Sequence, residues 1–249
     1  MISIKLLKKS NIKGYTFIEG FPGAGLVGPM SISYIINKLK MKYIGYIEGD
    51  SFPPLVSIHS STPMPLIRIY ISEEQKIVTA FAEFAIPIEL VKELSNVLYT
   101  FIKDSGISRI YSIGGIPQAQ PAEIGEQQKP FGVASNSALS KDIAKAGMQQ
   151  IVEGVSTGVG AILLIRSTLE SFDNINIMIQ VQPNVVDPIY AITAIDTLRK
   201  MMGLKIDTSD LDKEAKIIEA KIRDLANKHK EAHETYKKGV EDSGPSMYA

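Results

Sequence analysis

The sequence predicts an α/β fold, in which helices cover both faces of a mostly parallel or mixed β-sheet. Two observations lead to this prediction. Up to about residue 207, short runs of strand-forming residues alternate with amphipathic helical runs. The chain has 249 residues, of which 45% are hydrophobic, so it is long enough and apolar enough to bury a large core.

The elements follow one another with short connections, apart from two long loops. The expected strands are residues 2–7, 15–19, 42–48, 66–71, 77–81, 109–113, 132–134, 149–153 and 175–181. The expected helices are residues 26–39, 88–103, 136–146, 160–170 and 188–202. Residues 51–65 contain four prolines, which exclude a helix or a central strand and predict a surface loop or hairpin edge. Residues 114–130 are rich in Gln, Gly and Pro and predict a binding loop or a mobile segment.

The chain changes character after residue 207, so we divide it into an α/β domain (1–207), a charged amphipathic helix (208–238) and a flexible tail (239–249). Thr208 or Ser209 can cap the helix, which at about 1.5 Å per residue reaches on the order of 45 Å. Its other faces are charged, so it either packs one edge on the domain or pairs with another chain. The apolar seam, spaced by four and three, comprises Leu211, Ala215, Ile218, Ile222, Leu225, His229, Ala232 and Tyr236.

The last three residues offer three kinds of contact to a partner. Met247 is apolar, Tyr248 is a ring with a polar tip, and Ala249 carries the terminal carboxylate. Because the preceding helix and its Gly-containing tether hold this end away from the domain, the sequence favours a tail that inserts into a binding pocket.

The composition argues against several classes of function. Lys and Arg number 27 and Asp and Glu number 27, so there is no basic field to hold nucleic acid or an anionic membrane. No cysteine is present, which excludes disulfides, thiolate metal sites and thiol nucleophiles. The start lacks the apolar core of a signal peptide and the apolar runs are too short to cross a bilayer, so we expect a cytoplasmic protein. No Gly-Lys-Ser/Thr loop of the Walker type is found, which argues against an ATP-driven unfoldase.

Gly23, Gly25 and Gly28 match the G-x-G-x-x-G pattern between a strand and a helix, and Glu48 follows about twenty residues on. This spacing permits a dinucleotide site. However, Pro22 forms a rigid turn before the first glycine, and another proline lies within the start of the helix. We therefore favour a tight crossover, in which glycines allow positive φ and close packing.

Residues 154–158 have the G-x-S-x-G form of a nucleophile elbow, which would expose Ser156 at a sharp turn. A serine nucleophile needs a base and an acid. The acids follow in the usual hydrolase order, but one histidine lies upstream and the other two lie on the terminal helix, which would have to fold back over the domain, so a plain Gly/Ser turn is the preferred interpretation. The candidate partners are the bases His59, His229 and His233 and the acids Asp173 and Asp187.

Two further groups could be mistaken for chemical sites. His229 and His233 are four residues apart on one helical face, but no third ligand is evident, so we expect no metal site. Glu89 and Glu93 lie one turn apart near a helix start, where acids favour the helix dipole, and we assign neither these nor Glu83 a catalytic role.

Residues 17–28 resemble the signature segment of the archaeal proteasome assembly chaperone family, which is related to the second eukaryotic proteasome assembly chaperone. Residues 113–115, 131–136, 153–164 and 187–207 resemble the family in the same order. The resemblance implies a three-layer α/β/α sandwich like that of nucleoside phosphorylases, without established enzyme activity. The matching signature residues are Gly20, Phe21, Pro22, Gly23, Gly25 and Gly28.

The resemblance also implies a C-terminal hydrophobic-Tyr-any motif that docks between α-subunits of the proteasome ring, here Met247, Tyr248 and Ala249. We therefore expect a homo-oligomer that binds proteasome α-subunits, needs no cofactor, and either helps assembly or opens the gate without ATP. Residues 118–128 depart from the family pattern. The alternative is a phosphorylase-like or hydrolytic enzyme that uses the 23–28 loop for phosphate or Ser156 as nucleophile.

Overall fold

The computed structural model describes the α/β domain almost completely and only part of the C-terminal segment. The Gln-rich loop 118–128 and the tail residues Met247, Tyr248 and Ala249 lie outside the described residues. The described residues are 1–8, 10–59, 61–117, 129–182, 185–207, 210, 213, 216–220, 224, 227–228, 231 and 234–235.

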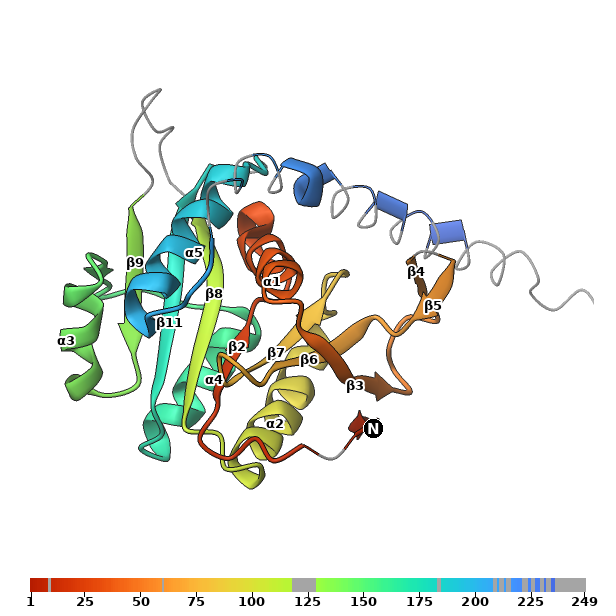
Figure 1. Ribbon diagram of the computed structural model, residues 1–249, viewed down its shortest axis with the longest axis horizontal. Coiled ribbons are helices and arrows are strands. Elements are labelled where there is room, and N and C mark those ends of the chain that lie inside the picture. The colour runs from red at the N-terminus through yellow and green to blue at the C-terminus, as the bar shows by residue number, and fades with distance from the viewer. Residues whose placement is uncertain are drawn as a thin grey trace, which may run out of the picture.

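Among these residues, nine strands form one mixed sheet (Figure 1). The strands in their order across the sheet are β1 (Ile2–Leu6), β3 (Lys42–Gly49), β6 (Ile67–Ser72), β7 (Ile77–Ala82), β2 (Thr16–Glu19), β8 (Arg109–Pro117), β11 (Asn174–Val181), β9 (Pro130–Ala134) and β10 (Gln149–Gln150).

The centre of the sheet is parallel and its flanks are largely antiparallel. β2 pairs in parallel with β7 and β8, and β8 pairs in parallel with β11. β1, β3 and β6 extend one side antiparallel, and β9 lies antiparallel to β11. Every residue of β7 is buried, as expected for a central strand with both faces covered. The predicted mixed sheet is confirmed.

Helices cover both faces of the sheet and complete three layers (Figure 1). α1 (Val27–Lys38), α3 (Ser137–Lys145) and α5 (Pro188–Met202) contribute to one core, whereas α2 (Ile88–Asp104) and α4 (Gly158–Leu169) contribute to the other. Successive residues of a strand point to opposite faces, so Phe17 and Ile18 of β2 belong to different cores and both are fully buried. The predicted α/β sandwich is confirmed.

Local sequence explains where two of the helices begin. The Asn136 side chain accepts a hydrogen bond of 3.2 Å from the Leu139 N–H and caps α3. Asp187 accepts one of 2.9 Å from the Ile189 N–H and caps α5, whose first residue is a proline. Gly203 ends α5 in the left-handed conformation, with φ of 66°.

The proline-rich segment 51–65 contains a short hairpin of β4 (Ser57–His59) and β5 (Thr62–Met64), which confirms the predicted hairpin edge. Most predicted boundaries agree with the structure within one residue, and the exceptions include the following. β8 continues four residues beyond Ile113, because β11 pairs with it as far as Val181 opposite Pro117. β10 ends at Gln150 rather than at residue 153, and α4 begins two residues earlier than predicted.

The C-terminal segment leaves α5 and crosses the outer side of α1 toward the β4–β5 hairpin (Figure 1). Its described residues between 213 and 235 are helical. Ile218 is only 5% exposed and belongs to the core beneath α1 and α5. Of the two arrangements left open by the sequence, the described part has one edge packed on the domain.

Candidate functional site

The glycine-rich signature forms the connection from β2 to α1, at the carboxyl ends of the parallel strands. A single 3-10 turn, Ala24–Leu26, precedes the helix. Gly25 has φ of 65° and Leu26 has φ of 51°, so two consecutive residues adopt the left-handed conformation. A glycine at the first of them removes the steric cost of this sharp turn.

Two glycines of the signature touch each other. A Cβ added at Gly20 would lie 2.6 Å from the carbonyl oxygen of Gly28, and one added at Gly28 would lie 2.7 Å from the carbonyl carbon of Gly20. A Cβ at Gly115 of β8 would collide with the carbonyl oxygen of Ala24. The chain's own backbone therefore fills the space that these glycines leave, which supports the tight-crossover interpretation over a phosphate cradle.

Glu19, at the end of β2, forms a hydrogen bond with the backbone at the start of this connection. It was not identified from the sequence as a candidate. Its side chain is buried, and Oε2 accepts a hydrogen bond of 3.1 Å from the Phe21 N–H. The carboxylate lies between Ser112 of β8 and Gly160 of α4, since a Cβ at Gly160 would meet both side chains within 3.0 Å. Burial raises the pKa of Glu19 to about 7, although Ser112 and the Phe21 N–H act in the opposite direction.

Ser156 lies on an exposed, irregular segment before α4. No hydrogen bond among the described residues joins it to a base, and His229 and His233 lie outside those residues. His59 instead contacts Glu83, at 2.9 Å between Nε2 and Oε2. Asp187 caps α5. The described part of the chain thus shows no catalytic triad around Ser156.

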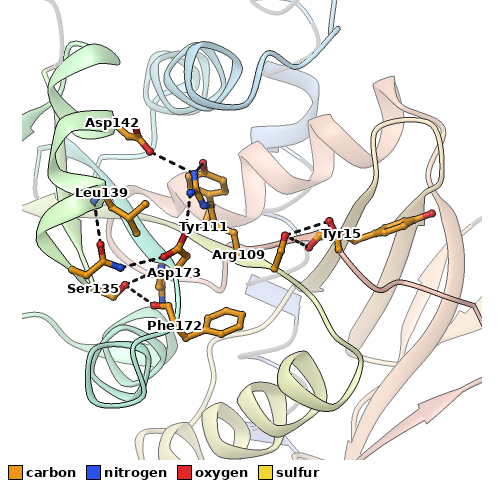
Figure 2. Close-up of polar contacts among 12 residues, drawn as sticks. Tyr15, Arg109, Tyr111, Ser135, Leu139, Asp142, Phe172 and Asp173 are labelled. Atoms are coloured by element: carbon orange, nitrogen blue, oxygen red, sulfur yellow. Dashed lines mark hydrogen bonds and ion pairs between the residues drawn. The ribbon is translucent and has the colours of Figure 1, made fainter.

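Asp173 is engaged in a structural network (Figure 2). Its carboxylate lies 2.9 Å from Nη2 of Arg109, and it accepts a hydrogen bond of 3.2 Å from the Asn136 amide. Arg109 also lies 3.6 Å from Asp142 and donates to the Tyr111 hydroxyl at 3.3 Å. These contacts tie together β8, the start of α3 and the turn before β11, so the position of Asp173 is explained by packing.

The first residues of the C-terminal segment, which we call its root, contact α1. The Tyr34 hydroxyl donates to the Asp207 carbonyl oxygen at 3.0 Å, and Nζ of Lys38 lies 2.5 Å from the Asp210 carboxylate. With Ile218 buried, these contacts fix the direction in which the segment leaves the domain. The pair Tyr34 and Lys38, four residues apart on a helix, gave no recognisable signal in the sequence.

The described residues contain no group of three or more His, Asp or Glu side chains that could hold a metal ion. Within the same residues, no helix is both long and apolar enough to span a membrane. The signature residues lie in the connection from β2 to the start of α1, whereas the predicted partner-binding residues Met247, Tyr248 and Ala249 lie outside the described part.

The three-layer sandwich places the chain among the α/β proteins, with a close-packed glycine crossover from β2 to α1. The PAC2 family profile matches residues 17–226, and the chain belongs to the PAC2 family. An uncharacterized protein of Methanocaldococcus jannaschii is 31% identical over 229 residues, which cover 91% of this chain and 92% of the relative.

Solved structures show the same fold. PbaA of Pyrococcus furiosus, an archaeal homolog of proteasome-assembly chaperone, matches with a TM-score of 0.81 and 25% identity over 92% of this chain and 99% of PbaA. PbaB of the same organism, an archaeal proteasome activator, matches with a TM-score of 0.74 and 22% identity over 90% of this chain and 98% of PbaB. The family profile confirms the predicted family, and the structural matches confirm the predicted fold.

Proposed function

We propose that this protein binds the α-ring of the proteasome through Met247, Tyr248 and Ala249, and so assists assembly or opens the gate without ATP. The observation that carries the proposal is membership of the PAC2 family combined with a hydrophobic-Tyr-any ending. The likeness to PbaA, a homolog of proteasome-assembly chaperone, and to the activator PbaB supports the choice of partner.

Each tail residue has a distinct role in this proposal. The Tyr248 ring fills a pocket wall and its hydroxyl seeks a polar partner, Met247 adapts to an uneven apolar surface, and the Ala249 carboxylate pairs with a cation of the pocket. One such contact, after the cost of ordering the tail, supports only micromolar to millimolar affinity.

The contacts between α1 and the start of the C-terminal helix, which we call the arm, support presentation of the tail to a partner. Because Lys38 holds Asp210 and Ile218 is buried, the root of the arm already has a fixed orientation. Fixing the root reduces the freedom that must be lost when the tail docks, which favours binding.

Several tails acting together would give useful affinity. We propose a cytoplasmic homo-oligomer that presents one arm per protomer, which raises the apparent affinity by about 10² to 10⁴ when several pockets are reached at once. Exposed apolar side chains around α4 support a surface for self-association. Val155 is 95% exposed, Ile165 50% and Leu169 77%.

The test is a pull-down with purified archaeal α-rings. The full chain is compared with a chain that lacks residues 240–249 and with Tyr248→Ala, and Ser246→Ala provides a control in the tail beside the motif. We expect α-subunits to be retained by the full chain and the control and lost with the other two. Equal retention by the deleted chain would contradict the proposal.

A further inference from the structure

A cavity of about 540 Å³ lies beside α1, outside the signature connection and the tail. Its walls come from α1, the β4–β5 hairpin, β6, β7 and the C-terminal helix. The volume falls within the range of small-molecule sites, roughly 300–1,000 Å³. The lining includes Ser33, Ile58, His59, Arg68, Phe81 and Glu83.

A buried charge stands in the wall of this cavity. Arg68 lies inside β6, and its neighbours Ile67 and Ile69 belong to the core under α2 and α4, so Arg68 points to the opposite face. Its side chain is 4% exposed, and its guanidinium lies 5.3 Å from the centre of the Phe81 ring. A buried ion pair adds little to stability compared with apolar residues, so this arginine calls for a functional explanation.

Two donors share a single carboxylate oxygen. Oε2 of Glu83 lies 2.7 Å from Nη2 of Arg68 and 2.9 Å from Nε2 of His59. Burial alone would raise the pKa of Glu83, but Arg68 and His59 outweigh it and lower the pKa below its ordinary value. Glu83 is therefore an anion that already serves both neighbours.

The cluster has more donor than acceptor capacity. Nε of Arg68 is buried and has no hydrogen-bond partner among the described residues. Asp224 and Lys228 at the rim already form their own ion pair at 2.6 Å. The unpartnered N–H of Arg68 is thus complementary to a ligand with acceptor oxygens, and a charged acceptor forms the stronger hydrogen bond with a guanidinium.

Five apolar side chains of the wall define the other end of the ligand. Ile36, Ile58, Met64, Phe81 and Ile218 line the cavity. We propose that the cavity binds a small monocarboxylate with an apolar body, whose carboxylate meets Arg68 and His59 and whose body packs against these side chains. Because Ile218 belongs to the C-terminal helix, the bound ligand would also contact the arm.

The test is isothermal titration of the full-length protein with 4-phenylbutyrate and with its neutral amide, 4-phenylbutanamide. We expect the acid to bind with one site per chain and at least tenfold more tightly than the amide. Absence of binding by the acid, or equal binding of acid and amide, would overturn the proposal.

Variants locate the site without leaving a buried charge unpaired. Ser33→Leu fills the cavity and is expected to weaken binding of 4-phenylbutyrate at least tenfold. The double variant Arg68→Met with Glu83→Gln removes both charges together and is expected to abolish the preference for the acid. Lys42→Met removes an exposed surface cation and should change nothing. Unchanged binding by a folded Ser33→Leu protein would show that the acid binds elsewhere and would refute the assignment.

The same chemistry is present in the chain's own tail, where a carboxylate follows Met247 and Tyr248. Titration of the chain that lacks residues 240–249 distinguishes the sources. An increased affinity for 4-phenylbutyrate identifies the tail as a competing occupant of the cavity. An unchanged affinity shows that the tail does not compete for the cavity and leaves a free small acid as the proposed ligand.

Discussion

Replacement of Glu19 by glutamine tests the electrostatics of the signature connection. The carboxylate is buried against Ser112 and Gly160, and burial raises its pKa from the ordinary 4.5 to about 7. Because the folded pKa is the higher one, the folded state binds the proton more tightly than the unfolded chain. Glu19 therefore does not reduce the free energy of unfolding below about pH 4.5. It reduces this free energy progressively as the pH rises, and the reduction is complete above about pH 7.

The size of this effect follows from the interval between the two pKa values. At about 1.4 kcal/mol per pH unit, the interval from 4.5 to about 7 corresponds to roughly 3 kcal/mol of unfolding free energy. A glutamine resembles the protonated acid and can still accept the Phe21 N–H. We expect the stability of Glu19→Gln relative to the natural protein to increase by about this amount between pH 4.5 and pH 7 and then to stay constant.

The assay is reversible denaturation by urea at a series of pH values, with the free energy of unfolding extrapolated to water. Glu48→Gln is the matched control, because that carboxylate is exposed on β3 and solvent hydrates it. A stability difference for Glu19→Gln that does not vary with pH, or that decreases as the pH rises, would refute the reasoning.

Three further changes have defined outcomes. Gly28→Ala places a Cβ within 2.8 Å of backbone atoms and should destabilise the fold by about 1–3 kcal/mol in thermal unfolding, whereas Gly23→Ala meets nothing within 4 Å and should be nearly neutral. Lys38→Met removes the ion pair with Asp210 and should speed tryptic cleavage of the C-terminal helix by a few fold, and unchanged cleavage would contradict the proposed root. Fluorophosphonate labelling of Ser156 is expected to be absent, and labelling that Ser156→Ala abolishes would restore the hydrolase alternative.

Most of the fold could be predicted from the sequence because its elements are locally consistent. The run 77–81 is apolar and β-branched, and it is β7, a strand buried on both faces. Asn136 and Asp187 mark helix starts through side-chain caps that depend on only a few neighbouring residues. Such signals can be recognised in the sequence because the residues that interact are close together in the chain.

The boundaries that were missed depend on residues far apart in the chain. Gly114 and Gly115 are poor strand formers, yet β8 passes through them because β11 supplies the hydrogen bonds. The sequence predicted close packing at the signature glycines, but it did not predict that Gly20 and Gly28 touch each other. That contact depends on how α1 packs on the sheet.

The charged groups were the hardest to predict. Glu83 was assigned no role, and His59 was considered only as a base for Ser156, whereas the structure joins both His59 and Arg68 to Glu83. One signal was present: Arg68 stands within an otherwise apolar strand, where a charge needs a partner. The identity of that partner depended on the pairing of β6 with β7 and on the hairpin, which sequence spacing does not reveal.

The central claim is that the terminal carboxylate and Tyr248 grip the α-ring. The most direct measurement is the affinity of the protein for purified α-rings before and after one glycine is appended to Ala249. We predict a loss of at least a hundredfold, with the fold unchanged, because the carboxylate is moved away from its cation and every tail of the oligomer is affected. An affinity equal to that of the unmodified chain would contradict the claim.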